Sequence, residues 1–300
     1  MLTFASSLIT TFQAIVLGAL QGVSELFPIS SLGHTVIFPT LFGWTNIVKW
    51  QSQTESPWLA FIVMLHVGSA VGLLIYFWRD WVVIVRSFFA TLGKRRIETP
   101  TERLAWVIVA ASIPTGLIGI AFEHTARVAT ATPEVASIFL VVNGFMLLGA
   151  ELLRRRQEAR VLAGRSGGRR FTARHIDSVS PKEGVILGLG QSLGLVAGMS
   201  RDGAVMSTGL VRDLDHSSAA RLSFLFATPI ILAAGIFKVG DLLGHNGAGI
   251  RGEAVVAAVA AAIAAIFTVH FLTRWFKTRT LTPFGIYCVL FGAAMVIYNA

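Results

Sequence analysis

The hydrophobic pattern divides the chain into long apolar runs and two apolar regions that polar residues interrupt. Six runs are long, or nearly long, enough to span a bilayer: 56–78, 104–122, 135–150, 222–237, 254–273 and 280–300. A helix needs about 20 apolar residues to cross the hydrocarbon core, so each run predicts one transmembrane helix. The interrupted regions are 2–42, broken around 28–34, and 184–210, broken around 197–203.

Lys and Arg residues alternate between the segments that connect these runs. Residues 79–103 hold six of them, residues 154–182 hold nine and residues 274–280 hold three. The opposite segments hold one each, namely Lys49, Arg127 and Arg251. Because basic connecting segments stay in the cytoplasm, the three rich segments are predicted to be cytoplasmic. This alternation requires each interrupted region to cross the membrane an even number of times, as two full spans or as a re-entrant pair.

The polar, glycine-containing breaks favour the re-entrant form, because non-helical backbone at membrane depth must line a cavity. The two regions then enter from opposite sides, and each precedes three spans, which makes an inverted repeat. Four residues recur at a constant offset of 170 positions: Gly18, Gln21, Ser30 and Gly33 match Gly188, Gln191, Ser200 and Gly203. Inverted repeats with broken helices are typical of transporters, in which the breaks meet at mid-membrane.

The pattern therefore predicts an all-α polytopic membrane protein with six transmembrane helices and two re-entrant helix pairs in an inverted-topology repeat. Residues 1–155 form the first repeat, residues 156–182 a basic cytoplasmic loop, and residues 183–300 the second repeat. Composition agrees, since 54% of residues are hydrophobic and only 14% are charged, against about 25% charged in soluble domains. The net charge of +9 lies mostly in short connecting segments without aromatic stacking platforms, which argues against nucleic-acid binding.

The first break carries a carboxylate, hydroxyls and an imidazole. Gln21 and Glu25 lie four residues apart, on one face if their stretch is helical. A carboxylate at membrane depth indicates function by default, although neutralising a buried arginine is the structural alternative for Glu25. Ser30, Ser31 and His34 follow, and a hydroxyl this close to an imidazole can pair a nucleophile with an acid/base group. A satisfied structural role is the alternative for His34.

The second break carries an arginine within glycines. Gly198, Ser200 and Gly203 flank Arg201, and glycines let backbone N–H groups approach an anion near a helix N-terminus. The guanidinium matches phosphate oxygens bidentately. An arginine in one break opposite Ser, His and Glu in the other predicts a phosphate site. His66, inside an apolar run, is interpreted as packing or hydrogen bonding, and no spacing predicts a zinc site.

These two breaks resemble the motifs of one family, the undecaprenyl-diphosphate phosphatases, also called the bacitracin-resistance family. The family's (E/Q)xxxE motif is similar to Gln21-Gly-Val-Ser-Glu25, followed by Phe27-Pro-Ile-Ser-Ser-Leu-Gly-His34. Its PGxSRSxxT motif is similar to Ala197-Gly-Met-Ser-Arg-Asp-Gly-Ala-Val205. The resemblance extends from about Gln13 to the C-terminus. It implies the same six spans and two re-entrant pairs.

The resemblance also implies an activity and its partners. The expected reaction converts undecaprenyl diphosphate into undecaprenyl phosphate and inorganic phosphate, which recycles the cell-wall lipid carrier. The expected location is the bacterial inner (plasma) membrane, with the site facing the periplasm. A divalent cation is the implied cofactor, with magnesium the expectation and Glu25 its ligand. The expected partners are the polyprenyl diphosphate lipid and the bilayer, while prenyl chain length and oligomeric state stay open.

The resemblance assigns roles by position. The family's essential Glu falls on Glu25, its hydroxyl nucleophile on Ser31 and its His on His34, while its phosphate-binding Ser-Arg pair falls on Ser200 and Arg201. Further substrate contacts are expected from the neighbouring polar and glycine residues Gln21, Ser30, Gly198, Asp202 and Gly203. A water molecule attacking phosphorus directly fits the sequence as well as Ser31 does.

The second motif departs from the family at three positions. Ala197 replaces Pro, Asp202 replaces the second Ser, and Val205 replaces Thr. Asp202 is expected either to help hold a metal or to pair with Arg201. Two other functions remain open: a transporter or flippase for a lipid phosphate, suggested by the repeat, and a catalytically weak lipid-binding homologue, suggested by these departures.

Overall fold

The computed structural model describes residues 9–51, 57–130, 132–163, 173–244 and 249–299, and over these residues the fold is helical. The α-helices in chain order are α1 Thr11–Ser24, α2 Ser31–Leu41, α3 Thr45–Gln51, α4 Pro57–Tyr76, α5 Trp78–Lys94, α6 Pro100–Ala129, α7 Pro133–Leu162, α8 Pro181–Gln191, α9 Arg201–Val211, α10 His216–Leu243, α11 Arg251–Trp275 and α12 Thr282–Asn299. Two short 3₁₀ turns, η1 Ile176–Ser178 and η2 Ser192–Leu195, precede and follow α8.

Six of these helices are long and apolar enough to cross a membrane, which confirms the six predicted apolar helices and makes the chain a multi-pass membrane protein. They are α4, α6, α7, α10, α11 and α12. Several extend beyond the apolar runs. For example, α7 continues to Leu162 because its polar end is rich in Glu, Leu, Arg, Gln and Ala, which are strong helix formers. Residues 56 and 300, the outer ends of two predicted runs, lie outside the described residues.

The basic segment after α4 contains a helix that the apolar runs do not reveal. In α5 the charged residues Arg79, Arg86 and Lys94 interrupt the apolar sequence. No apolar run in this helix is therefore long enough to span a membrane. The 3.6-residue period is nevertheless kept, with exposed apolar side chains such as Val83 and Phe89 on the helix. The helix ends at Arg95, whose backbone is left-handed, with φ 57°.

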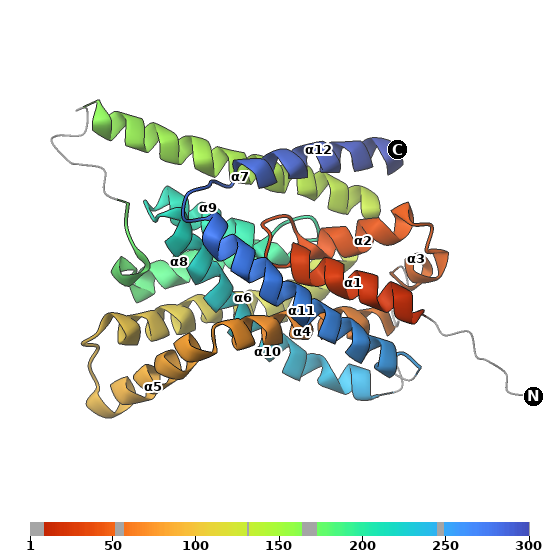
Figure 1. Ribbon diagram of the computed structural model, residues 1–300, viewed down its shortest axis with the longest axis horizontal. Helices are drawn as coiled ribbons and strands as arrows, with labels where there is room; N and C mark the ends of the chain where they lie inside the picture. The colour runs from red at the N-terminus through yellow and green to blue at the C-terminus, as the bar shows by residue number, and fades with distance from the viewer. Residues whose placement is uncertain (1–8, 52–56, 131, 164–172, 245–248, 300) are drawn as a thin grey trace, which may run out of the picture.

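The first short helix of each half packs against a long helix of the other half. Figure 1 shows α7 and α12 side by side along one edge, and α1 lying against α11, more than half the chain away. In the same manner α8 packs against α6. Glycines allow these close contacts: a Cβ on Gly18 of α1 would meet the carbonyl of Ala257, and one on Gly188 of α8 would meet the carbonyl of Ala111. Small residues are what membrane helices need to approach this closely.

Capping fixes the entry of both short helices. Thr10 and Gln13 form a capping box at the start of α1, and Ser180 and Glu183 form another at the start of α8. Each box satisfies two backbone N–H groups that a helix N-terminus leaves without partners. After both helices the backbone leaves the helical path, and the chain re-enters a helix at α2 and α9. The fold thus brings two interrupted helix pairs into the middle of the bundle.

Candidate functional site

The two breaks touch one another directly. The backbone N–H of Gly198 donates a hydrogen bond to Ser30 Oγ at 3.1 Å. At the same crossing, a Cβ on Gly33 would lie 3.0 Å from the Cα of Gly198. Gly198 itself has φ 97°, a conformation that glycine adopts without steric cost. The sequence prediction that the two breaks lie opposite each other is confirmed by these contacts.

The two loops end in the same local structure. The hydroxyl of Ser30 accepts a hydrogen bond from the N–H of Gly33 at the start of α2, at 3.2 Å. The hydroxyl of Ser200 accepts one from the N–H of Gly203 at the start of α9, at 3.0 Å. These are N-cap bonds, and they are made by the residues that recur at the constant sequence offset. In each break a helix N-terminus, that of α2 or α9, therefore lies at the site.

Asn143 of α7 joins the two breaks and was not predicted. Its Nδ2 donates to the carbonyl of Pro28 at 2.9 Å, and its Oδ1 accepts from the N–H of Ser200 at 3.0 Å. The side chain is fully buried. One amide within the apolar part of a 30-residue helix is a weak sequence signal, because nothing along the chain indicates its partners. Structurally, this residue sets the spacing between the loops.

Glu25 is the centre of the polar cluster. Its Oε1 lies 2.8 Å from Arg201 Nη2, so an ion pair links the first break to the second. Its Oε2 accepts hydrogen bonds from the hydroxyl of Ser31 and from Gln21 Nε2, the latter at 2.9 Å. Glu25 is only 7% exposed. The structure therefore brings three other predicted site residues, Gln21, Ser31 and Arg201, around the carboxylate of Glu25.

His66 of α4 also reaches this carboxylate, which agrees with the hydrogen-bonding role expected from the sequence and adds Glu25 as its partner. Its Nε2 lies 3.4 Å from Glu25 Oε2. Its Nδ1 lies 2.9 Å from the carbonyl of Ile62, one turn earlier in α4. That contact fixes the ring and leaves Nε2 directed at Glu25. The available signal was a single imidazole within an apolar run, since ionisable residues at membrane depth indicate function.

Arg201 has a buried donor group that no hydrogen bond satisfies. Its Nη1 is inaccessible to solvent and has no partner among the described residues. Its Nη2 is shared between Glu25 and Asp202 Oδ1, which lies at 3.1 Å. Of the two alternatives for Asp202, this geometry favours pairing with Arg201. An unsatisfied guanidinium nitrogen beside two helix N-termini is suited to receive phosphate oxygens.

His34 takes part in a different set of contacts. Its Nδ1 lies 2.7 Å from the carbonyl of Ser30, and its Nε2 lies 2.8 Å from the hydroxyl of Tyr287 on α12. Its ring stacks with Phe38 and Phe291. The hydrogen bonds of the described residues do not link His34 to Ser31 or Glu25. The structure thus places the His34 ring against α12 rather than beside the hydroxyl of Ser31.

These residues fit a divalent cation only if the substrate phosphates and water supply the rest of its ligands. No three His, Cys, Asp or Glu side chains among the described residues lie close enough to hold a metal. However, Gln21 Oε1 is a buried oxygen that finds no hydrogen-bond partner in the described part of the chain, next to the Glu25 carboxylate. Magnesium is commonly bound through one or two carboxylates with waters and substrate phosphates completing its shell. Glu25 and Gln21 supply the protein part of such a shell.

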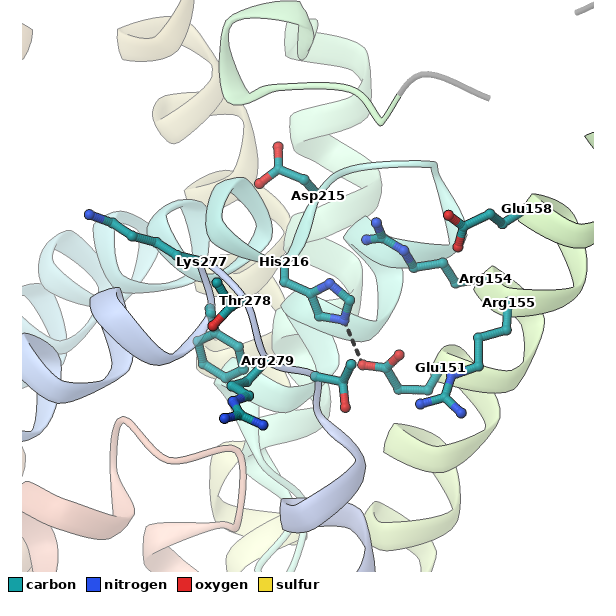
Figure 2. Close-up of a pocket in the computed structure, with 11 residues that line it drawn as sticks. Glu151, Arg154, Arg155, Glu158, Asp215, His216, Lys277, Thr278 and Arg279 are labelled. Carbon is teal, nitrogen blue, oxygen red and sulfur yellow. Dashed lines mark hydrogen bonds and ion pairs between the residues drawn. The ribbon is translucent and has the colours of Figure 1, made fainter. Parts of the chain in front are cut away.

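A separate polar cavity lies at the end of α7, and it does not contain the predicted site. Its volume is about 290 Å³. Figure 2 shows His216 of α10 directed at Glu151 of α7, with Nε2 and Oε1 2.6 Å apart. The same oxygen accepts the backbone N–H of Leu281, at 2.7 Å. Glu151 therefore joins α7, α10 and the start of α12, which is a structural role.

Comparisons with known proteins agree with the geometry. The family model "Bacitracin resistance protein BacA" matches residues 14–294. An undecaprenyl-diphosphatase of Mycolicibacterium paratuberculosis is 47% identical, over 96% of this chain and 97% of that protein. An undecaprenyl-diphosphatase of Mycobacterium avium is 46% identical over the same shares. Undecaprenyl-diphosphatase 2 of Frankia alni is 44% identical, over 96% of this chain and 98% of that protein.

Proposed function

The chain belongs to the bacitracin resistance protein BacA family, and on this premise we propose that it hydrolyses undecaprenyl diphosphate. The products are undecaprenyl phosphate and inorganic phosphate, and the reaction recycles the cell-wall lipid carrier at the plasma membrane. The observation that carries the proposal is the Glu25–Arg201 ion pair between the two breaks, with a hydroxyl bonded to the carboxylate. The names of relatives at 44–47% identity agree with it.

Substrate binding follows from the donors that the second break presents. The buried Nη1 of Arg201 and the N-terminus of α9 bind the oxygens of the diphosphate, while the prenyl chain stays in the bilayer. The N-terminus of α2 faces the same place from the first break. Phosphoryl transfer needs mainly positioning and charge neutralisation, so this small set of donors is sufficient. The carboxylate of Asp202 pairs with Arg201 and partly neutralises its positive charge.

Ser31 is the proposed nucleophile and Glu25 its base. The Ser31 hydroxyl already donates to Glu25 Oε2, which is the geometry a general base requires. As the Ser31 Oγ–phosphorus bond forms, its proton passes to Glu25 and the bridging P–O bond breaks, leaving undecaprenyl phosphate. The departing undecaprenyl phosphate takes that proton from Glu25. Water then attacks the phosphoserine: Glu25 accepts a proton from the water and returns it to Ser31 Oγ as the Oγ–phosphorus bond breaks and inorganic phosphate leaves. His66 orients the carboxylate, and His34 supports the loop. Direct attack by water, assisted by Glu25, is the alternative.

Glu25 and Gln21 would hold the divalent cation, with magnesium the expected ion. When bound, the cation would neutralise charge on the diphosphate. Removal of divalent cations by a chelator is expected to abolish phosphate release by the wild-type protein, and magnesium is expected to restore it. A wild-type rate that stays unchanged in excess chelator would contradict this part of the proposal.

We also propose that the two helix pairs are re-entrant and that residues 1–155 and 183–300 form an inverted repeat around the loop 156–182. The packing of α1 on α11 parallels that of α8 on α6. The caps of Ser30 and Ser200 are made by residues at the same sequence offset. A cysteine introduced at residue 95 or 279 is expected to react with an impermeant thiol reagent only from the cytoplasmic side. Labelling from the periplasm would overturn the cytoplasmic orientation of these segments on which the repeat depends.

The test of the activity is phosphate release from undecaprenyl diphosphate by purified protein in detergent with magnesium. Glu25→Gln, Ser31→Ala and Arg201→Gln are each expected to lose at least about 100-fold in rate. Ser24→Ala is the matched control, because Ser24 is buried beside Glu25 but bonds only to the carbonyl of Leu20. It is expected to keep its activity. A wild-type protein that releases no phosphate would refute the proposal.

Two results separate the other candidate functions. A lipid transporter predicts that Ser31→Ala protein in vesicles still moves prenyl phosphate across the bilayer. A lipid-binding homologue predicts tight binding of the diphosphate with no turnover. Trapping a phosphorylated Ser31 under single-turnover conditions supports the covalent route, and its absence favours direct attack by water.

A further inference from the structure

A cavity of about 690 Å³ lies where α4, α5, α10 and α11 meet. Residues 76–80, where α4 meets α5, line one side, and residues 217–221 at the start of α10 line another. Residues 270–277 at the end of α11 complete the wall. Its volume falls within the range of about 300–1,000 Å³ that holds ligands larger than a simple ion.

The charge of this cavity is strongly positive. Asp80 is its one lining carboxylate, and it is already paired with Arg221, at 2.9 Å. Arg79, Arg274 and Lys277 remain, all with exposed side chains. No ion pair of the described residues involves these three cations. The Arg79 guanidinium instead lies 5.3 Å from the centre of the Trp78 ring. The cavity thus presents three cations and no available anion.

The depth of the cavity is that of a membrane surface. The spans Trp58–Tyr76 and Arg251–Trp275 end at it, and the span His216–Phe237 begins at it. Tryptophans stand near the ends of two of these spans, as is usual at the boundary between hydrocarbon and headgroups. The basic connecting segments lie on this side, which is the predicted cytoplasmic one.

An exposed apolar ridge on α11 leads to the cavity. Ile263 and Phe267 are 52% and 72% exposed, and His270 and Arg274 follow on the same face at spacings of three and four residues. This order along one face, apolar first and cationic last, matches a molecule with an acyl chain and an anionic headgroup. A soluble anion has no apolar part that could contact the ridge.

We propose that this cavity binds the phosphate headgroup of an anionic glycerophospholipid whose acyl chain lies along the α11 ridge. Arg79, Arg274 and Lys277 contact the phosphate, and the lipid ties α11 to the joint of α4 and α5. The smaller cavity at the end of α7 is a natural comparison. Figure 2 shows that Lys277 points away from the His216–Glu151 pair there, and three carboxylates oppose its cations.

Native mass spectrometry of the full chain, stripped of lipid in neutral detergent, tests this proposal. Phosphatidylglycerol is titrated against phosphatidylcholine, and inorganic phosphate is added in a third arm. The double variant Arg274→Gln/Lys277→Gln is expected to bind phosphatidylglycerol about 25-fold more weakly, at roughly fivefold for each cation near a membrane surface. The control Arg155→Gln/Arg279→Gln removes the same charge from the smaller cavity and is expected to change the affinity less than about twofold.

Three results would overturn the proposal: equal losses in both double variants, equal binding of the two lipids, or full displacement of the lipid by inorganic phosphate. The first would mean diffuse attraction of anionic lipid, and the last a free-anion site. If the double variant does not fold, as judged by size-exclusion chromatography, Arg79→Gln is measured in its place. It is expected to weaken binding about fivefold.

Discussion

Replacing Asn143 with alanine tests whether one buried amide holds the two halves of the site in register. The substitution removes the bond to the carbonyl of Pro28 and the bond from the N–H of Ser200. Both groups lie in non-helical loops, so no helical hydrogen bond replaces the lost partner. Their surroundings are buried, and water is excluded from them.

The expected cost follows from these two groups. A buried polar group left without a partner costs about 1–3 kcal/mol, so Asn143→Ala is expected to lower the free energy of unfolding by about 2–6 kcal/mol. The loops carry Ser31 and Arg201, and a shift of about 1 Å in a reacting group can reduce the rate about 100-fold. We therefore expect at least that loss in phosphate release from the fraction of protein that remains folded.

The matched control is Ser137→Ala on the same helix. Ser137 is also fully buried, but its hydroxyl bonds only to the carbonyl of Pro133, one turn away. Such bonds between membrane helix groups contribute about 0.6 kcal/mol on average. Both variants are measured by reversible unfolding in mixed detergent micelles and by phosphate release. The reasoning fails if Asn143→Ala matches Ser137→Ala in stability and keeps wild-type activity.

Three further outcomes are expected. His66→Leu should lower kcat about 10-fold to 100-fold, since a hydrogen bond to a charged group contributes about 1.5–3 kcal/mol, and unchanged kcat would contradict the orienting role. Gly188→Val should lower the melting temperature by forcing α8 from α6, whereas Gly116→Val, whose Cβ meets no atom within 4 Å, should not; equal shifts would count against close packing. Hydrogen bonds from Arg174 hold the pKa of Glu183 well below its ordinary 4.5, so the pair stabilises the fold above that pH and the stability is lost as pH falls below it. Glu183→Gln should therefore make the free energy of unfolding less dependent on pH below 4.5.

The sequence allowed the six apolar helices and the meeting of the two breaks to be predicted, because both depend on local signals. Apolar length defined the six spans, and glycines with polar residues defined the breaks. Glu25 and Arg201 were notable because charge at membrane depth is costly without a partner. The Ser31 hydroxyl bonded to the same carboxylate is what favours the functional interpretation of Glu25 over charge neutralisation alone.

The remaining site residues depend on contacts between distant segments, which no local pattern reports. Asn143 and Tyr287 lie within apolar stretches of their helices, and their partners are far along the chain: Ser200 lies 57 positions and Pro28 115 positions from Asn143, and His34 lies 253 positions from Tyr287. His34 was expected near Ser31 from spacing alone, yet its ring turns towards α12. Helix α5 was not predicted because apolar length identifies only spans, whereas the sequence of α5 indicates a helix through its 3.6-residue periodicity.

The crossed packing of the short helices has a consequence for biosynthesis. The glycine face of α1, which leaves the ribosome first, has its partner in α11, the last helix but one. Until α11 is made, α1 lacks the surface against which it packs, and the first break has no fixed position. Active protein is therefore expected to form only after α11 has been made, and a truncated chain that ends after α10 is expected to be inserted in the membrane yet inactive.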